Sequence, residues 1–301
     1  MIRLAVRVAR QQAELVLVEL LELAPGGVEE VQVDEQTVEY AVYGAPGELP
    51  ALGDLNAAVG DALVEISTSE TPDDWQERWK RFHHPVLIEP PVAVTAQQRQ
   101  IPALHVRPPW ERPRPGGEGE VEEIVIDPGQ AFGTGGHAST RLCLELLLEL
   151  AAGQGQAAAL VDVGTGSGVL AIAAARLGFM PVLGLDHERE SVEAARQNAR
   201  ANGVQIEVRR FDLRSQPIPW LEDTAAGASG QGEVVMVANL LRPLLLELAA
   251  RLSRPPAQLV AGGLLEGELE EVSAAFGDRL GMHERERRTS GEWAALWLLG
   301  A

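Results

Sequence analysis

The stretch Val161-Asp162-Val163-Gly164-Thr165-Gly166-Ser167-Gly168-Val169-Leu170 predicts the fold of this 301-residue chain. Residues 157–163 are apolar or small apart from one acid, as in a buried strand of a parallel sheet. The three glycines then allow a sharp turn and let a ligand approach the backbone closely. Residues 169–177 are rich in Ala and Leu and favour a helix. Strand, glycine turn and helix together predict a doubly wound α/β domain, whose ligands bind beyond the carboxyl ends of the strands.

The rest of the chain after residue 121 continues this alternation of strands and helices. Upstream of the stretch we expect a strand at 124–126, a glycine-rich loop at 127–137 and a helix at 138–150. Downstream we expect strands at 181–185, 206–210, 233–237, 258–261 and 293–299, with helices at 187–202, 244–252 and 266–276. Residues 223–232 are rich in Ala, Gly and Ser, and we expect them to form a surface insertion. The pattern predicts an α/β domain over residues 121–301.

The first 70 residues have a different pattern. Apolar residues alternate at 2–8, 28–33, 37–43 and 63–67, and recur at helical spacing at 11–23 and 51–63. This βαββαβ order is typical of a small α+β ferredoxin-like domain, which we interpret as a recognition domain or a structural appendage. Residues 71–120 are predicted to connect the two domains through a short helix that carries Trp75, Trp79 and Phe82 on one stripe.

Composition narrows the class of function. A formal net charge of −19 argues against direct nucleic-acid or membrane contact and favours a basic partner, although acidity can also simply keep a protein soluble. The single cysteine, Cys143, excludes an internal disulfide and a thiolate zinc cluster, and its Leu-rich surroundings predict a buried small side chain rather than a nucleophile. No metal is expected. With no long apolar run and no leader, we expect a cytoplasmic protein, with a monomer as the simplest oligomeric state.

The glycine turn and the next strand end mark a cofactor site. Gly164, Gly166 and Gly168 form a G-x-G-x-G pattern rather than the G-x-G-x-x-G of dinucleotide sites. Asp186 ends the second strand, where a carboxylate can accept two ribose hydroxyl hydrogens. These features suit NAD and adenosyl cofactors equally, so on them alone an NAD-linked oxidoreductase stays open.

Two polar side chains favour S-adenosylmethionine. Asp162 would repel a pyrophosphate, but it could hold the cationic amino-acid end of S-adenosylmethionine. Asn239, at the end of the fourth strand, offers a carbonyl that could hold an incoming N–H and point the nitrogen lone pair at a methyl group. The alternative for Asn239 is a helix cap, because Arg242-Pro243 is typical of a helix start. Spacing alone leaves both interpretations open.

A longer set of motifs resembles a known family. The loop Asp127–His137 (DPGQAFGTGGH), with Thr140 and Leu142-Cys143-Leu144 after it, looks like the signature of the ribosomal protein L-eleven methyltransferase (PrmA) family. The resemblance also includes residues 74–80, 107–110, 162–168, 186, 238–240 and 291–293, so it covers 71–301 by motifs and 1–70 by architecture only. The chain departs from the family pattern at Ala138-Ser139, at Thr165, where the family usually has Cys, and at Leu240, where it usually has Ile.

The resemblance implies a class I (Rossmann-like) S-adenosylmethionine methyltransferase domain at 121–301, preceded by a ferredoxin-like substrate-recognition domain at 1–70. It implies transfer of methyl groups to lysine side chains and/or the N-terminal amine of ribosomal protein L-eleven. By motif position it places cofactor contacts at Thr140, Gly164, Asp186 and Asn239. With the side chains inferred above, the expected cofactor set is Thr140, Asp162, Gly164, Gly166, Asp186, Asp212 and Asn239, and Asn239 is the expected catalytic residue.

Several alternatives remain open at this level. Asp212 is expected to contact the adenine amino group, or else to be an exposed turn carboxylate. His137 could act as a base, but proton transfer within this kind of site is not obligatory. The loop 127–137 is expected to close over the cofactor, the alternative being a static connection. For the whole protein, the competing functions are methylation of another protein or a small amine, NAD-linked oxidation, and a non-catalytic binding module.

Overall fold

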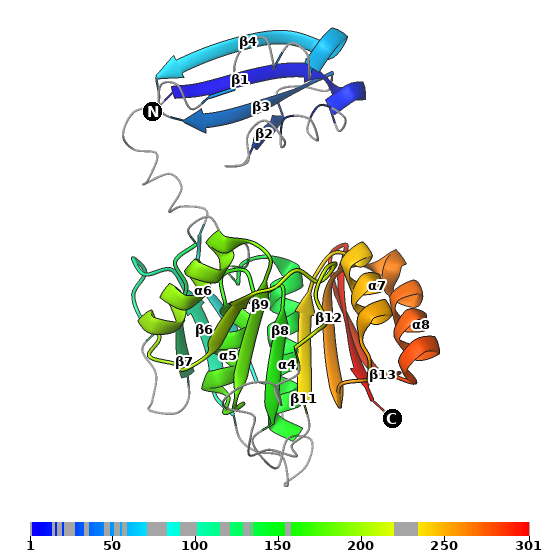
Figure 1. Ribbon diagram of the computed structural model, residues 1–301. Helices are drawn as coiled ribbons and strands as arrows, with labels where there is room; N and C mark the ends of the chain where they lie inside the picture. The colour runs from blue at the N-terminus through cyan, green and yellow to red at the C-terminus, as the bar shows by residue number, and fades with distance from the viewer. Residues whose placement is uncertain are drawn as a thin grey trace. The chain divides into compact units, whose positions relative to one another are not determined.

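The chain folds into two compact units, Met1–Phe82 and His83–Ala301 (Figure 1). The computed structural model describes residues 2–13, 16, 20, 28–32, 36–44, 49–50, 55, 59–70, 83–90, 101–114, 121–128, 133, 135–153, 158–219 and 234–300. The connecting helix expected around Trp75, the insertion expected at 223–232 and part of the loop 127–137 lie outside the described residues.

The first unit contains a four-stranded antiparallel sheet in the order β2-β3-β1-β4. Its elements are β1 (Ile2–Ala9), η1 (Arg10–Gln12), β2 (Glu29–Gln32), β3 (Thr37–Gly44), η2 (Gly60–Ala62) and β4 (Leu63–Glu70). One face of the sheet is buried because apolar residues alternate along β1, where Leu4, Val6 and Val8 point to the same side. Most of the two helices expected at 11–23 and 51–63 lies outside the described residues, so the ferredoxin-like assignment stays a prediction.

The second unit is built on a seven-stranded sheet in the order β10-β9-β8-β11-β12-β14-β13. Its strands are β8 (Ala159–Val163), β9 (Val182–Asp186), β10 (Glu207–Arg210), β11 (Val234–Asn239), β12 (Gln258–Leu265), β13 (His283–Ser290) and β14 (Trp293–Leu299). The five strands from β10 to β12 are parallel, whereas β14 runs antiparallel to both of its neighbours. The strand order reverses between β8 and β11, which in doubly wound sheets opens a crevice at the carboxyl ends.

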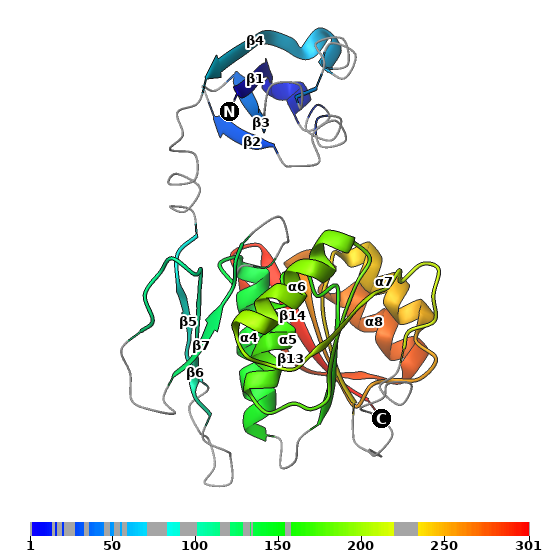
Figure 2. The same ribbon diagram turned by 60° about the vertical axis from the view of Figure 1, so that its left-hand side comes forward.

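Helices cover both faces of this sheet (Figure 1, Figure 2). They are α4 (Ala138–Gly153), α5 (Val169–Arg176), α6 (Arg189–Ala201), α7 (Arg242–Arg251), η4 (Glu266–Glu268) and α8 (Leu269–Leu280). Side chains alternate across each strand, so Leu160 packs with α4 and α5 in one core, while Val161 packs with α7 and α8 in the other. The doubly wound α/β domain predicted from the glycine-turn stretch is confirmed.

A separate three-stranded sheet, β5-β6-β7, belongs to the second unit. It consists of β5 (Val86–Ile88), β6 (Ala103–Arg107) and β7 (Val121–Val125), and its Leu104, Val106 and Ile124 join the core around α4 and α5. The strand expected at 124–126 therefore pairs with β6 and not with the large sheet. The described residues 83–90 and 101–114 belong to the second compact unit, in which β6 pairs in parallel with β7.

Strand β13 was not predicted from the sequence. Its residues, His-Glu-Arg-Glu-Arg-Arg-Thr-Ser, contain no apolar side chain, and β13 forms the edge of the sheet beside β14 alone. Charged edge strands of this kind protect a sheet from pairing with other chains, but they lack the apolar alternation by which strands are found in a sequence.

Candidate functional site

The glycine turn after β8 is held against β9 and faces the end of β11. The backbone N–H groups of Gly164 and Thr165 both donate to Leu185 O, at 2.8 and 2.9 Å. Gly164 has φ +77°, and a Cβ built there would lie 2.4 Å from Cδ2 of Leu240. The positive φ favours glycine at this position, and any Cβ there would require the Leu240 side chain to shift.

Asp186 links the turn to the next strand. Its carboxylate accepts hydrogen bonds from Gly166 N at 2.9 Å and from Glu188 N at 3.1 Å, and the residue is buried. Each carboxylate oxygen has a further lone pair. The side chain therefore sets the geometry of the turn and can still accept hydrogen bonds from a ligand.

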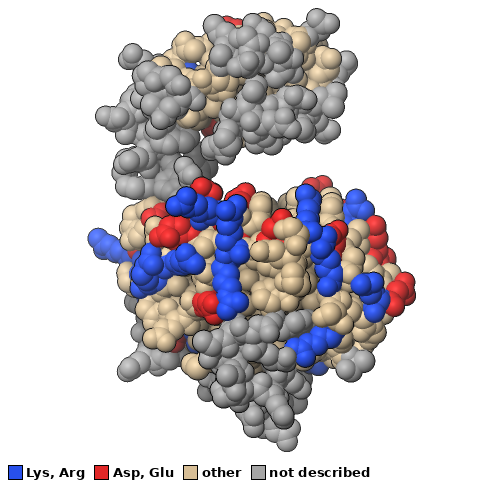
Figure 3. Space-filling model, viewed as in Figure 1, with Lys and Arg blue, Asp and Glu red and all other residues tan. Residues whose placement is uncertain are grey.

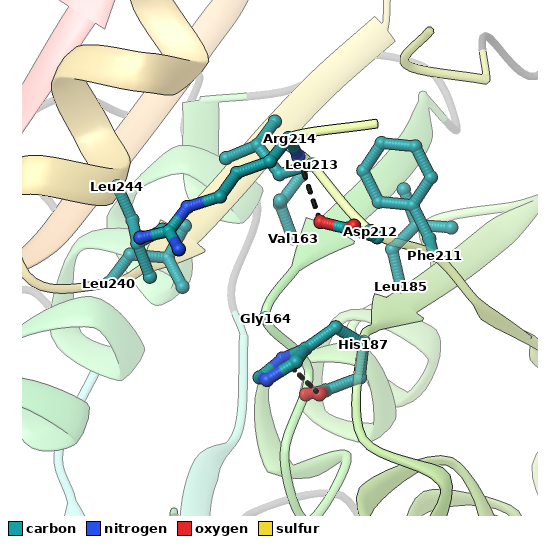
Figure 4. Close-up of a pocket in the computed structure, with 11 residues that line it drawn as sticks. Val163, Gly164, Leu185, His187, Phe211, Asp212, Leu213, Arg214, Leu240 and Leu244 are labelled. Atoms are coloured by element: carbon teal, nitrogen blue, oxygen red, sulfur yellow. Dashed lines mark hydrogen bonds and ion pairs between the residues drawn. The ribbon is translucent and has the colours of Figure 1, made fainter. Parts of the chain in front are cut away.

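A groove runs over these strand ends. Its first part is mainly apolar (Figure 4) and is lined by Val163, Gly164, Leu185, Asp186, His187, Phe211, Asp212, Leu213, Arg214, Leu240 and Leu244. Its second part is more polar and is lined by Gly133, Thr140, Gly164, Thr165, Gly166, Val169, Leu170, Asp186, His187, Glu188, Ser191, Asn239, Leu240 and Leu244. The two parts share Gly164 and Asp186, so together they could hold one elongated ligand with an apolar ring at one end.

Asp162 is completely buried in β8, behind the turn. Its Oδ2 accepts a hydrogen bond of 2.7 Å from Thr165 Oγ1, while its Oδ1 is buried with no hydrogen-bond partner. Burial raises the pKa of Asp162 from 3.8 to about 7, and the neighbouring Asp186 carboxylate adds to the shift. Asp162 lines neither part of the groove, so within the described residues its carboxyl bears on the site through Thr165, which does line it.

Asn239 ends β11 on the opposite side of the crevice. Its Nδ2 donates to Thr140 Oγ1 at 3.2 Å, and its Oδ1 is buried without a partner. The predicted alternative of a helix cap is wrong, because the N-cap of α7 is Leu241 and no side chain caps that helix. The unpaired amide oxygen lies against Gly262 and Gly263, where a Cβ would come within 3.2 and 3.1 Å of it. Two unpaired buried acceptors thus occur on the neighbouring strands β8 and β11.

Asp212 and His137 have other contacts. Asp212 is exposed and, of the two parts of the groove, lines the apolar one; its carboxylate accepts from Arg214 N at 2.9 Å (Figure 4). It also accepts from Ser215 Oγ at 2.7 Å within its own turn. His137 Nδ1 lies 2.8 Å from Ser139 Oγ, and the ring packs edge-on against Trp293 with centroids 4.6 Å apart. Burial lowers the pKa of His137 below its usual value. Neither expected role is tested by these contacts.

The structure brings Thr140, Gly164, Gly166, Asp186 and Asn239 together along one groove. Sequence reasoning missed its apolar lining, chiefly Leu185, Phe211, Leu213, Leu240 and Leu244. These residues carry no distinguishing chemistry in the sequence. For Leu185, Phe211, Leu213 and Leu240 the one available signal was position, since they lie at or just after a strand end, where ligands of such sheets bind. Leu244 lies in the first turn of α7 and carried no such signal.

Comparison with known proteins agrees with this geometry. A family model described as Ribosomal protein L11 methyltransferase (PrmA) matches residues 28–299. The chain belongs to this family. The resemblance stated from the motifs is thereby confirmed, and so is the class I methyltransferase fold.

Two relatives and one solved structure illustrate the similarity. The chain is 36% identical over 229 residues to a ribosomal protein L11 methyltransferase of Heliobacterium modesticaldum, covering 74% of this chain and 63% of the relative. It is 34% identical over 276 residues to one of Syntrophotalea carbinolica, covering 90% and 78%. A crystal structure of a ribosomal protein L11 methylase from Lactobacillus delbrueckii subsp. bulgaricus is similar with a TM-score of 0.53 and 31% identity, covering 65% of this chain and 94% of that one. The match thus spans less than two thirds of the Heliobacterium relative.

Proposed function

We propose that this chain is an S-adenosylmethionine-dependent protein N-methyltransferase that modifies amino groups of ribosomal protein L11, at lysine side chains and/or the N-terminal amine. The observation that carries the proposal is the groove at the carboxyl ends of the strands, where Thr140, Gly164, Asp186 and Asn239 lie together and Asn239 Oδ1 is buried without a partner. That amide oxygen suits a target amine. The names of the relatives support L11 as the substrate.

The residues of the groove fit S-adenosylmethionine. The apolar part, between Leu185, Phe211 and Leu240, suits the adenine ring, and Asp186 would accept hydrogen bonds from the ribose hydroxyls. Gly164 leaves room for the cofactor to lie close to the backbone. Asp162 would act through Thr165, which lines the groove and donates to its carboxylate.

When bound, the cofactor supplies a methyl group that its sulfonium already activates. The chain then has to position the amine and to exclude water. Asn239 would accept an N–H of the target amine, so that the nitrogen lone pair points along the methyl–sulfur axis. Thr140, which contacts the Asn239 amide, would hold that side chain in place. The target must be a neutral amine, and its proton can pass to solvent without a base from the chain.

Charged side chains of both signs share the surface of the second unit. Figure 3 shows basic and acidic side chains next to one another on the visible face of the second unit. Ion pairs of this unit include Arg242 with Glu271 at 2.7 Å and Arg200 with Glu193 at 3.2 Å. The net charge of −19 still favours a basic partner such as a ribosomal protein. In the part of the chain that the structure describes, no helix is long and apolar enough to cross a bilayer.

The proposal is tested by incubating purified L11 with the enzyme and S-adenosylmethionine and measuring its mass. We expect mass increases in steps of about 14 Da, which localise to lysines or the N-terminal amine. Equal methylation of an unrelated basic protein would favour the competing function with another substrate. Thermal stabilisation by NAD, but not by S-adenosylhomocysteine, would favour an oxidoreductase instead.

A pH dependence follows from Asp162. Its pKa is raised by folding to about 7, so its contribution to stability is fully present below its unfolded pKa and is lost as the pH rises through about 7. As the pH is raised from about 5.5 to 8, the Tm of the free wild-type protein should therefore fall more than the Tm of Asp162→Asn, whose amide does not titrate. Both values are measured in thermal unfolding scans. Parallel Tm curves for the two proteins would show that the buried carboxyl does not titrate in this range.

A further inference from the structure

Two polar side chains outside the expected cofactor set connect the glycine turn to the segment before α4. Asn198, on the buried face of α6, is 3% exposed, and Ser167, in the turn, is fully buried. Asn198 Nδ2 donates to Ser167 O at 2.8 Å, and Asn198 Oδ1 accepts from Asp127 N at 3.0 Å. The amide therefore bridges two backbone segments 40 residues apart, since Asp127 and Ser167 both bond to it.

Ser167 extends this connection to the wall of the groove. Its Oγ donates to Gly133 O and also accepts from Val169 N at 3.3 Å. Gly133 lines the polar part of the groove together with Thr140 and Asn239. A Cβ at Gly133 would lie 3.3 Å from Ser167 Oγ, so this wall is packed directly on the turn.

Helix α6 is held tightly against the same turn. A Cβ at Gly168 would meet Ala195 Cα at 3.1 Å, so α6 cannot move away from or toward the turn without a change of packing. The position of Asn198 is therefore set by the helix, and both hydrogen-bonding groups of its amide are used. Helix α6 therefore fixes an amide that joins the glycine turn to Asp127.

We infer that Asn198 and Ser167 are positioning residues for the cofactor. They hold Asp127 and Gly133 against the glycine turn and thereby fix the position of Gly133, which lines the polar part of the groove. The inference rests on the proposed function, in which this groove binds an adenosyl cofactor. It assigns neither residue a contact with the cofactor itself. Their effect passes through the backbone at Gly133 and at the turn.

Asn202 provides a matched control. It lies one turn further along the chain, is 6% exposed, and its amide also bonds to the backbone before the loop, donating to Val125 O at 2.7 Å and accepting from Val125 N at 2.8 Å. It makes no hydrogen bond to the glycine turn within the described residues. Asn198→Ala and Asn202→Ala should thus cost similar stability, while only the first should disturb the groove.

The test measures S-adenosylhomocysteine binding by calorimetry on the full chain, with Tm as the measure of stability. We expect Kd to rise about tenfold in Asn198→Ala and in Ser167→Ala, comparable to the loss of roughly one hydrogen bond, and to stay within about twofold in Asn202→Ala. Because the two residues act as one connection, the double variant should bind about as weakly as either single variant rather than about 100-fold more weakly than the wild type.

Each outcome has a separate meaning. Unchanged affinity in Asn198→Ala, or equal loss of affinity in Asn202→Ala, would overturn the inference while leaving the proposed function intact. A wild-type chain that does not bind S-adenosylhomocysteine would instead contradict the proposed function. If Asn198→Ala does not fold, Ser167→Ala decides alone, because it removes one hydroxyl and keeps the bridge between α6 and the turn.

Discussion

Replacing Asn239 by Ala should lower kcat for methylation of L11 by about 100-fold, the order of loss seen when a preorganised group at the reacting atoms is removed. The amide oxygen is buried without a partner and lies at the end of β11, beside the switch in strand order. The substitution would remove the group that we propose to orient the amine nitrogen toward the methyl group. The measurement is the initial rate of methylation at saturating L11 and saturating cofactor.

The loss in kcat should exceed the loss in cofactor affinity. Asn239 also lines the cofactor groove, so some weakening of S-adenosylhomocysteine binding is expected. The rate at saturating cofactor separates the two effects. A variant that keeps more than about a tenth of the wild-type kcat would show that Asn239 does not position the amine. Asn202→Ala, which removes a buried amide elsewhere, should keep the full kcat.

Replacing Gly164 by Ala should weaken S-adenosylhomocysteine binding by about 10- to 100-fold. A loss of this size corresponds to the usual free-energy cost of adding an atom to a tightly packed site. The new Cβ would lie 2.4 Å from Leu240 Cδ2, and Leu240 lines both parts of the groove. To relieve this contact, the Leu240 side chain or the turn has to shift, which would change the lining of the groove. Calorimetric titration gives the affinity, and denaturant unfolding gives the stability.

Gly203→Ala is the control for backbone strain. Gly203 has φ +63°, close to the φ +77° of Gly164, but a Cβ there meets nothing within 4 Å. Both substitutions should cost about 1–2 kcal/mol of stability through the left-handed conformation. Only Gly164→Ala should lose affinity. If the two variants bind S-adenosylhomocysteine equally well, the close approach of Gly164 to Leu240 has no part in the site.

The pattern of apolar residues predicted strands correctly where one or both faces of the strand are buried. The central strand was expected within 157–163 and is β8 (Ala159–Val163), and the last strand was expected and found at Trp293–Leu299. Apolar runs of this kind need no information from distant residues. The same reasoning missed β13, whose charged residues hold the sheet edge, and it could not show that β7 pairs with β6, since pairing depends on which strands meet in space.

The residue types of the candidate site were readable from the chain, because the glycine turn, Asp186 and Asn239 stand at strand ends whose role follows from the order of elements. The hydrogen bonding and burial of these side chains could not be predicted from the sequence. That Asp162 and Asn239 each keep a buried oxygen without a donor, and that Asn198 bridges the turn and Asp127, follows from contacts between segments far apart in sequence. Spacing along the chain places side chains at the groove, but hydrogen bonding and burial depend on what the folded chain brings beside them.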